Sequence, residues 1–142
     1  METTKKRTVI TVNTTVNAPM EKVWKYFNFP EFITKWYYAS DDWHAPMSKG
    51  DFKEGGKMTT RMEAKDKSMG FDFTVTFTKI KNNELVEYVM EDGRKVNIKF
   101  EQDGKGVKIV EAFEAEDQNP EEMQRAGWQA ILDNFKKYAE QN

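Results

Sequence analysis

The turns that divide the second half of the chain are too short for anything but antiparallel pairing. Asn82-Asn83, Asp92-Gly93 and Asp103-Gly104 each separate two segments in which apolar and polar residues alternate. Asp-Gly is typical of type I′ hairpin turns, because both central residues of such a turn need a positive φ. Parallel strands need a crossover of a dozen or more residues. The sequence therefore predicts an antiparallel meander.

The clearest strand covers residues 71–80, and segments 96–100 and 107–113 repeat its pattern. Every second residue of this strand is polar, whereas the residues between them are large and apolar and belong to one inner row: Phe71, Phe73, Val75 and Phe77. Alternation of this kind is typical of a strand with one buried face. A sheet with one apolar face must be covered by another element.

The C-terminal segment is predicted to be that cover. Asn119 is a suitable N-cap and Pro120 a suitable first residue of a helix. From there to Tyr138 the apolar residues recur at helical spacing. A strand over residues 8–16 and two short helices, beginning near Pro19 and Pro30, precede the meander. We expect one α+β domain over residues 1–142.

Composition excludes several classes of protein. Acidic and basic residues are interspersed and the formal net charge is −2, so the basic surface of a nucleic-acid-binding protein is missing. No cysteine is present to form a disulfide or a thiolate nucleophile. No apolar run is long enough to span a bilayer, and Lys5, Lys6 and Arg7 are interpreted as a solvated tail. We expect a cytoplasmic protein.

Several motifs resemble landmarks of the AHSA1-like family, which belongs to the START/Bet v 1 (SRPBCC) superfamily and is named after the activator of the Hsp90 ATPase. In chain order they are Val16-Asn-Ala-Pro-Met-Glu-Lys-Val-Trp24, Pro30-Glu31, Lys35-Trp36, Gly55-Gly56, and Gly127-Trp128 with Leu132. The resemblance spans essentially the whole chain. It implies the helix-grip fold, with about seven strands in the order β-α-α-β6-α curved around a long C-terminal helix.

The resemblance implies a function only broadly, because one fold supports many activities. Many relatives in the superfamily bind lipids, sterols or polyketides between the sheet and the last helix, and some are enzymes. We therefore favour binding of an apolar small molecule over catalysis, with a cyclase- or hydrolase-like enzyme as the alternative. A chaperone-linked interaction domain is a further alternative. Nothing here corresponds to the separate N-terminal domain of the eukaryotic activator, so Hsp90 activation is not carried over.

His44 is the only histidine and the only side chain that ordinarily titrates near neutral pH. In a strand, Asp42 and His44 would share one face, where the carboxylate could orient the imidazole for proton transfer. The alternative is a histidine on an edge strand with no catalytic task. One histidine beside two carboxylates is not a convincing metal site, and no cofactor motif is present, so neither a metal nor a cofactor is predicted.

Glu111 has the same parity as the apolar residues of the predicted strand 107–115, which points its carboxylate toward the apolar face. Burial of an unpaired carboxylate costs several kcal/mol or keeps the group protonated. Glu111 therefore needs a partner, a water-filled pocket, or a bulge that turns it outward. Thr14 and Thr60 are possible partners from other inner rows. Glu111 joins His44 as a candidate acid–base residue.

A set of residues is predicted to line a ligand cavity beneath the helix, because methionine and aromatic side chains adapt to apolar guests. The set is Met58, Met62, Phe73, Phe77, Tyr88, Met90, Glu111 and Trp128. The alternative is that they form an ordinary packed core. Gly127 costs about 1 kcal/mol in a helix interior, which predicts either the close approach of a neighbouring element or a kink that opens space beside Trp128.

Overall fold

The computed structural model describes residues 7–142, so the prediction for Lys5 and Lys6 falls outside it. In chain order the described elements are β1 (Val9–Val16), α1 (Met20–Asn28), α2 (Pro30–Ile33), β2 (Trp43–Gly50), β3 (Lys57–Ala64), β4 (Gly70–Lys81), β5 (Leu85–Met90), β6 (Lys95–Asp103), β7 (Gly106–Glu114) and α3 (Glu121–Gln141). None of these helices has the length and apolar character needed to cross a membrane.

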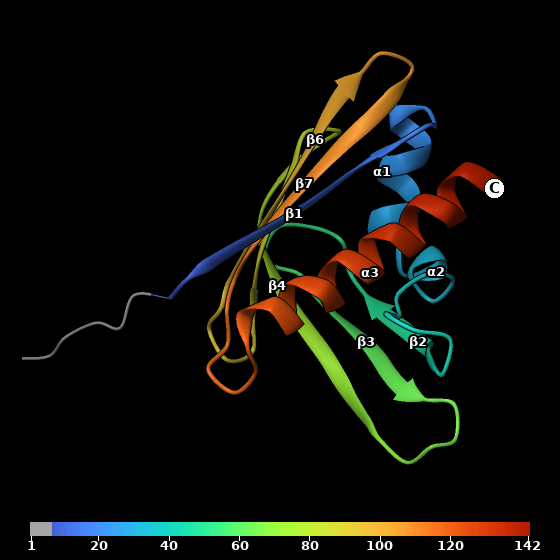
Figure 1. Ribbon diagram of the computed structural model, residues 1–142. Helices are drawn as coiled ribbons and strands as arrows, with labels where there is room; N and C mark the ends of the chain where they lie inside the picture. Colours follow the sequence, from blue (N-terminus) through green and yellow to red (C-terminus); the bar gives the residue numbers. More distant parts are fainter. Residues whose placement is uncertain (1–6) are drawn as a thin grey trace, which may run out of the picture.

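The strands form one antiparallel sheet in the order β1-β7-β6-β5-β4-β3-β2. The sheet curves around α3, and α1 and α2 lie beside the C-terminal half of that helix (Figure 1). The predicted α+β class and the helix-grip arrangement are both confirmed. So is the meander, because β4 pairs with β5, β5 with β6 and β6 with β7, all antiparallel. The type I′ turn is not confirmed: in each of the three short turns only the second residue, Asn83, Gly93 or Gly104, has a positive φ (64°, 90° and 60°).

The start of α3 differs by one residue from the prediction. Pro120 has the extended ψ of 144° and precedes the first helical residue, so Asn119 is not the N-cap. A side chain from inside the helix makes the local hydrogen bonds instead. The Gln124 amide nitrogen donates to the carbonyl groups of Asn119 (2.8 Å) and Glu116 (3.1 Å), and its oxygen accepts from the Glu116 N–H (2.9 Å).

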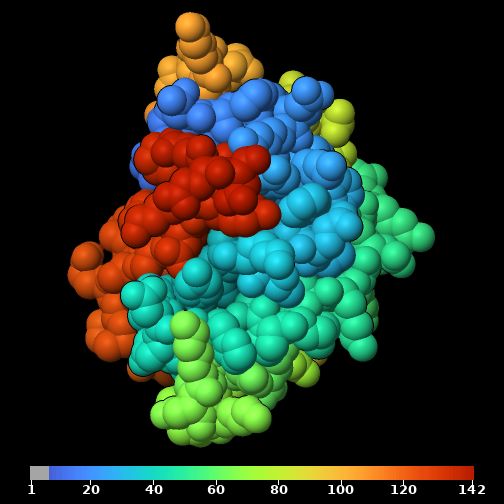
Figure 2. Space-filling model, turned by 90° about the vertical axis from the view of Figure 1, so that its right-hand side faces the viewer, coloured from blue at the N-terminus to red at the C-terminus, as the bar shows by residue number. Residues whose placement is uncertain are grey.

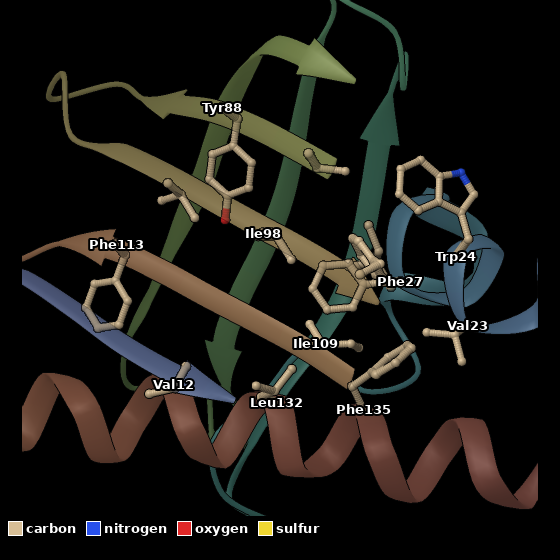
Figure 3. Close-up of a cluster of buried hydrophobic side chains, with 14 of the residues drawn as sticks. Val12, Val23, Trp24, Phe27, Tyr88, Ile98, Ile109, Phe113, Leu132 and Phe135 are labelled. Carbon is tan, nitrogen blue, oxygen red and sulfur yellow. The ribbon is translucent and has the colours of Figure 1, made fainter. Parts of the chain in front are cut away.

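An aromatic part of the core lies where α1 meets the C-terminal half of α3. Phe27 of α1 contacts Phe100, Trp36 and Phe135, with ring centroids 5.3, 5.2 and 5.0 Å apart. Figure 3 shows Val23, Trp24, Phe27 and Phe135 gathered at this end, whereas Tyr88 and Phe113 lie toward the other. Aromatic packing therefore closes one end of the space between sheet and helix.

Candidate ligand-binding site

A cavity of about 360 Å³ lies between the sheet and α3. Strands β3 to β7, helix α3 and the segment that follows α2 all contribute to its walls. All of the residues predicted as a lining are among its wall residues: Met58, Met62, Phe73, Phe77, Tyr88, Met90, Glu111 and Trp128. Four of them, Met58, Phe77, Tyr88 and Met90, also belong to the buried core cluster. Binding by these residues stays a prediction.

The cavity reaches the molecular surface near the β3–β4 hairpin. Phe71 and Met123 belong to the cavity wall, yet they are 48% and 60% exposed. The prediction that Phe71 is part of a buried inner row is therefore wrong, because β4 extends beyond the cover of α3. Figure 2 shows this hairpin, in green, at the lower end of the molecule, below the helices. The opening therefore lies between this hairpin and the first turns of α3.

Glu111 points inward, as the parity of β7 predicts. Glu111 pairs with Val12 of β1 and with Ile98 of β6. The pairing of β7 with both strands is uninterrupted, so no bulge turns Glu111 outward. The residue is 7% exposed and belongs to the cavity wall. Burial raises the pKa of Glu111 to about 8, because the apolar surroundings disfavour the charged form.

The proposed threonine partners do not serve Glu111. Thr60 exchanges a hydrogen bond with the Ser48 hydroxyl at 2.9 Å, and Thr14 is half-buried opposite Ile109. Within residues 7–142, Glu111 has neither a hydrogen-bond partner nor an ion-pair partner. The polar groups that do lie near enough to interact electrostatically with its carboxylate are the phenols Tyr37 and Tyr88.

The phenols of Tyr37 and Tyr88 lie close enough to interact with each other inside the cavity. Burial raises the pKa of both phenols, and the negative charge of Glu111 raises them further. Both groups are therefore protonated hydroxyls throughout the neutral range. The Tyr88 hydroxyl points from β5 into the space between sheet and helix (Figure 3).

Sequence reasoning missed Tyr37. It lies between α2 and β2, where no period of apolar residues reveals which side chain points inward. The only signal was its position directly after Trp36 of the family-like Lys35-Trp36 pair. Trp36 is 2% exposed, and its ring lies 5.1 Å from that of Tyr37.

Aromatic rings surround the polar groups. Phe73 stacks on Tyr37 with centroids 6.0 Å apart at 26°, and it meets Tyr88 edge to face at 6.4 Å. On the helix side, Trp128 stacks on Phe113 at 4.0 Å. The result is a cavity with one carboxyl group and two phenols set among aromatic walls.

His44 lies outside this cavity. It is on edge strand β2, its side chain is 39% exposed, and its Nε2 atom lies 3.1 Å from Glu63 Oε1. Asp42 accepts instead from the Ser40 hydroxyl, so the expected Asp42–His44 arrangement is wrong. The hydrogen bond from Arg61 is the main cause that lowers the pKa of Glu63. The histidine belongs to a charge cluster with Glu63 and Arg61, and it is not part of the cavity wall.

Gly127 lines the cavity, and a Cβ atom placed on it would meet no atom within 4 Å. The predicted close approach of a neighbouring element is therefore wrong. Open cavity space faces this position instead. In the part of the chain that the structure describes, no group of three or more His, Asp and Glu side chains could hold a metal ion.

These features define a helix-grip domain with an apolar cavity that contains a single unpartnered carboxyl group. A family model described as Activator of Hsp90 ATPase homolog 1-like protein matches residues 17–140. The chain therefore belongs to the AHSA1-like family, as the sequence motifs predict. A search of curated proteins found no significant match.

Solved structures agree with this assignment. An AHSA1-like protein from Aeromonas hydrophila, determined by NMR in solution, is 41% identical with a TM-score of 0.88, and the alignment covers 94% of this chain and 93% of that one. A protein from Cytophaga hutchinsonii is 53% identical with a TM-score of 0.80, covering 94% and 92%. A protein from Nitrosomonas europaea is 16% identical with a TM-score of 0.81, covering 94% of each chain, and shows the fold alone.

Proposed function

We propose that this protein binds an apolar small molecule in the cavity between the sheet and α3. The observation that carries the proposal is the cavity itself: about 360 Å³ of space with mostly apolar and aromatic walls. Small-molecule sites occupy a few hundred Å³ or more, and a few polar groups fix the orientation of the ligand. Tyr37, Tyr88 and Glu111 are those polar groups.

The test uses a variant that fills the cavity without disturbing the fold. Gly127→Leu places a side chain in open space, whereas Ala126→Leu adds the same side chain at a neighbouring exposed position of α3. We expect fatty acids, sterols or aromatic polyketides to change the fluorescence of the wild-type protein, because Trp128 lines the cavity. Gly127→Leu should weaken this response at least tenfold, and Ala126→Leu should leave it unchanged. Equal binding by all three proteins would refute the proposal.

A cavity enzyme is the second candidate, and the position of Glu111 favours it. A carboxyl group that is still protonated near neutral pH can donate a proton to a bound substrate. The test is recovery of the ligand after prolonged incubation, followed by mass spectrometry. Unchanged ligand supports a binding protein, and a product that Glu111→Gln does not form supports catalysis.

An interaction with an Hsp90-type chaperone is a separate prediction that the family name suggests. Its test is stimulation of the chaperone ATPase by the purified protein, compared with Gly127→Leu. Stimulation that survives filling of the cavity would assign the function to the outer surface.

A further inference from the structure

The other charged and amide side chains of the cavity wall already have partners. Asn28 donates to the Trp24 carbonyl at 2.9 Å, and Gln124 bonds to the segment before α3. Arg94 is held by Asp92 at 2.7 Å and also donates to the Glu114 carbonyl at 3.3 Å. Among the charged and amide side chains of the wall, Glu111 is the one with no hydrogen-bond or ion-pair partner within residues 7–142. Its carboxyl oxygens are accessible from the cavity, where a ligand or water can satisfy them.

The fold does not need a carboxyl group at this position. Glu111 is flanked along the inward row of β7 by Ile109 and Phe113, both 0% exposed, and an apolar side chain there would avoid the cost of burying an acid. Buried polar groups ordinarily have a hydrogen-bond partner. The acidic group is therefore better explained by recognition than by packing.

The surroundings of Glu111 match the chemistry of an organic cation. The faces of aromatic rings attract cations, and an aromatic enclosure is a recurring site for substituted ammonium groups. Tyr37, Phe73 and Tyr88 provide such rings, and the two phenol oxygens retain capacity to accept hydrogen bonds. A primary ammonium group has three N–H donors, which Glu111 and the two phenols can receive.

We propose that the ligand is an apolar amine whose ammonium group sits against Glu111, between the rings of Tyr37, Phe73 and Tyr88. This inference rests on the proposed function, since it requires that the cavity takes up a small molecule. It specifies the chemical class of that molecule: a basic nitrogen on a hydrophobic body small enough for about 360 Å³.

The proposal predicts a coupled proton release. The groups that face Glu111 are the phenols of Tyr37 and Tyr88, which do not titrate near neutral pH, and Arg94 is also part of the cavity wall. The α3 residues of the cavity wall have no titratable side chain. With a pKa of about 8, Glu111 is mostly protonated at pH 7. Pairing with ammonium favours the carboxylate, so each binding event should release up to one proton.

The pH dependence of affinity follows from the same linkage. From pH 6 to pH 8 the affinity for an amine should rise, by at most about tenfold per pH unit, because the deprotonated acid becomes more populated. Above pH 8 the affinity should level off. It should fall only when the amine itself loses its proton, at about pH 10.

Three probes with the same hydrophobic body separate the possibilities: 4-phenylbutylamine, 4-phenylbutan-1-ol and 4-phenylbutanoate. Calorimetry at pH 8 should show the amine binding at least tenfold more tightly than either analogue. Repeating the amine titration at pH 7 in buffers with different ionisation enthalpies should show a net release of protons, up to one per ligand, and the alcohol should release none.

Variants test the role of Glu111 directly. Glu111→Gln keeps the shape of the side chain and should abolish both the preference for the amine and the proton release, while binding of the alcohol persists. Glu101→Gln, an exposed change on β6, should alter neither. Tyr37→Phe should lower the affinity for the amine severalfold and leave the proton release intact. This variant tests the proposal if Glu111→Gln folds poorly.

Two results would overturn the inference in distinguishable ways. If the alcohol binds as tightly as the amine, or if Glu111→Gln keeps the preference, the amine is not the ligand class, although the binding function stands. If none of the three probes binds the wild-type protein at millimolar concentration, the inference and the proposed function both fail.

Discussion

The indole ring of Trp128 lies parallel to the ring of Phe113, with centroids 4.0 Å apart and an interplanar angle of 9°. Phe113 is on the inward row of β7, two residues beyond Glu111, and Trp128 lines the cavity from α3. This stack joins helix to sheet beside the carboxyl group. The stack therefore fixes the distance between α3 and the sheet next to the proposed ligand.

We expect Trp128 and Phe113 to be energetically coupled. Aromatic pairs contribute about 0.5–1.5 kcal/mol beyond the area that they bury, so a double-mutant cycle with Trp128→Leu and Phe113→Leu should give a coupling energy in this range. Urea denaturation of the four proteins measures it. The matched cycle pairs Phe113→Leu with Trp43→Leu, because Trp43 contacts Phe71 instead. That cycle should be additive within about 0.5 kcal/mol, and equal coupling in both cycles would contradict the prediction.

Glu111 should make stability fall with increasing pH. Burial raises its pKa from 4.5 to about 8 in the folded protein, so the folded state holds a proton that the unfolded state has lost. The contribution of this proton to the free energy of unfolding is fully present below pH 4.5. It declines between pH 4.5 and pH 8, by at most about 1.4 kcal/mol per pH unit. Above pH 8 the loss is complete.

The measurement is the free energy of unfolding between pH 5 and pH 9. The wild-type curve should decline relative to that of Glu111→Gln, in which no acid titrates at this position. Glu101→Gln should follow the wild-type curve, because Glu101 is exposed. Parallel curves for wild type and Glu111→Gln would show that the buried carboxyl does not titrate in this range.

Strand periodicity carried the successful part of the sequence prediction. Side chains alternate between the two faces of a strand, so parity alone placed Glu111, Phe73 and Tyr88 on the inner face. Turn chemistry fixed the order of pairing, because each short connection joins neighbours. A one-residue bulge in β7 would have reversed the prediction for Glu111, and the continuous register shows that none occurs.

The other predictions depended on tertiary distances that a single sequence does not contain. Tyr37 reaches Tyr88 from a segment without periodicity, and Thr60 is satisfied by Ser48 across the β2–β3 pair. His44 is paired with Glu63 of the adjacent strand, not with Asp42 of its own segment. Nor could sequence distinguish a crowded Gly127 from one that faces empty space.

Gly127→Ala should stabilise the protein. The new methyl group would meet no atom within 4 Å, and alanine is favoured over glycine in a helix interior by about 1 kcal/mol. We expect the free energy of unfolding to rise by about 0.5–1 kcal/mol. The reverse change at the exposed neighbour, Ala126→Gly, should lower it by a similar amount. Destabilisation by Gly127→Ala would mean that the space beside α3 is closed in solution.

His44→Gln should leave ligand binding unchanged, because His44 is not part of the cavity wall. It should also change the free energy of unfolding by less than about 1 kcal/mol, since partly exposed ion pairs contribute little. Titration with the same probe ligands and urea denaturation check both expectations. A loss of affinity as large as that caused by Gly127→Leu would show that His44 takes part in ligand binding.

Lys136 should stabilise the free edge of the sheet. Three α3 side chains donate hydrogen bonds to β1 carbonyl groups: Arg125 to Thr11 (2.9 Å), Gln129 to Asn13 (3.0 Å) and Lys136 to Thr15 (2.6 Å). β1 is an edge strand, and unpaired edges invite pairing with other chains. The helix thus covers this edge as well as the cavity.

We expect Lys136→Met to keep the packing of the side-chain stem but to lose the bond to Thr15, at a cost of about 0.5–1.5 kcal/mol. The hydrogen bond from Lys136 is also the main cause that lowers the pKa of Glu140, so that pKa should rise in the variant. Lys137→Met is the matched control, because Lys137 is exposed and has no such contact among residues 7–142. Urea denaturation and NMR titration of Glu140 measure the two effects, and equal behaviour of the two variants would show that the contact with β1 contributes nothing.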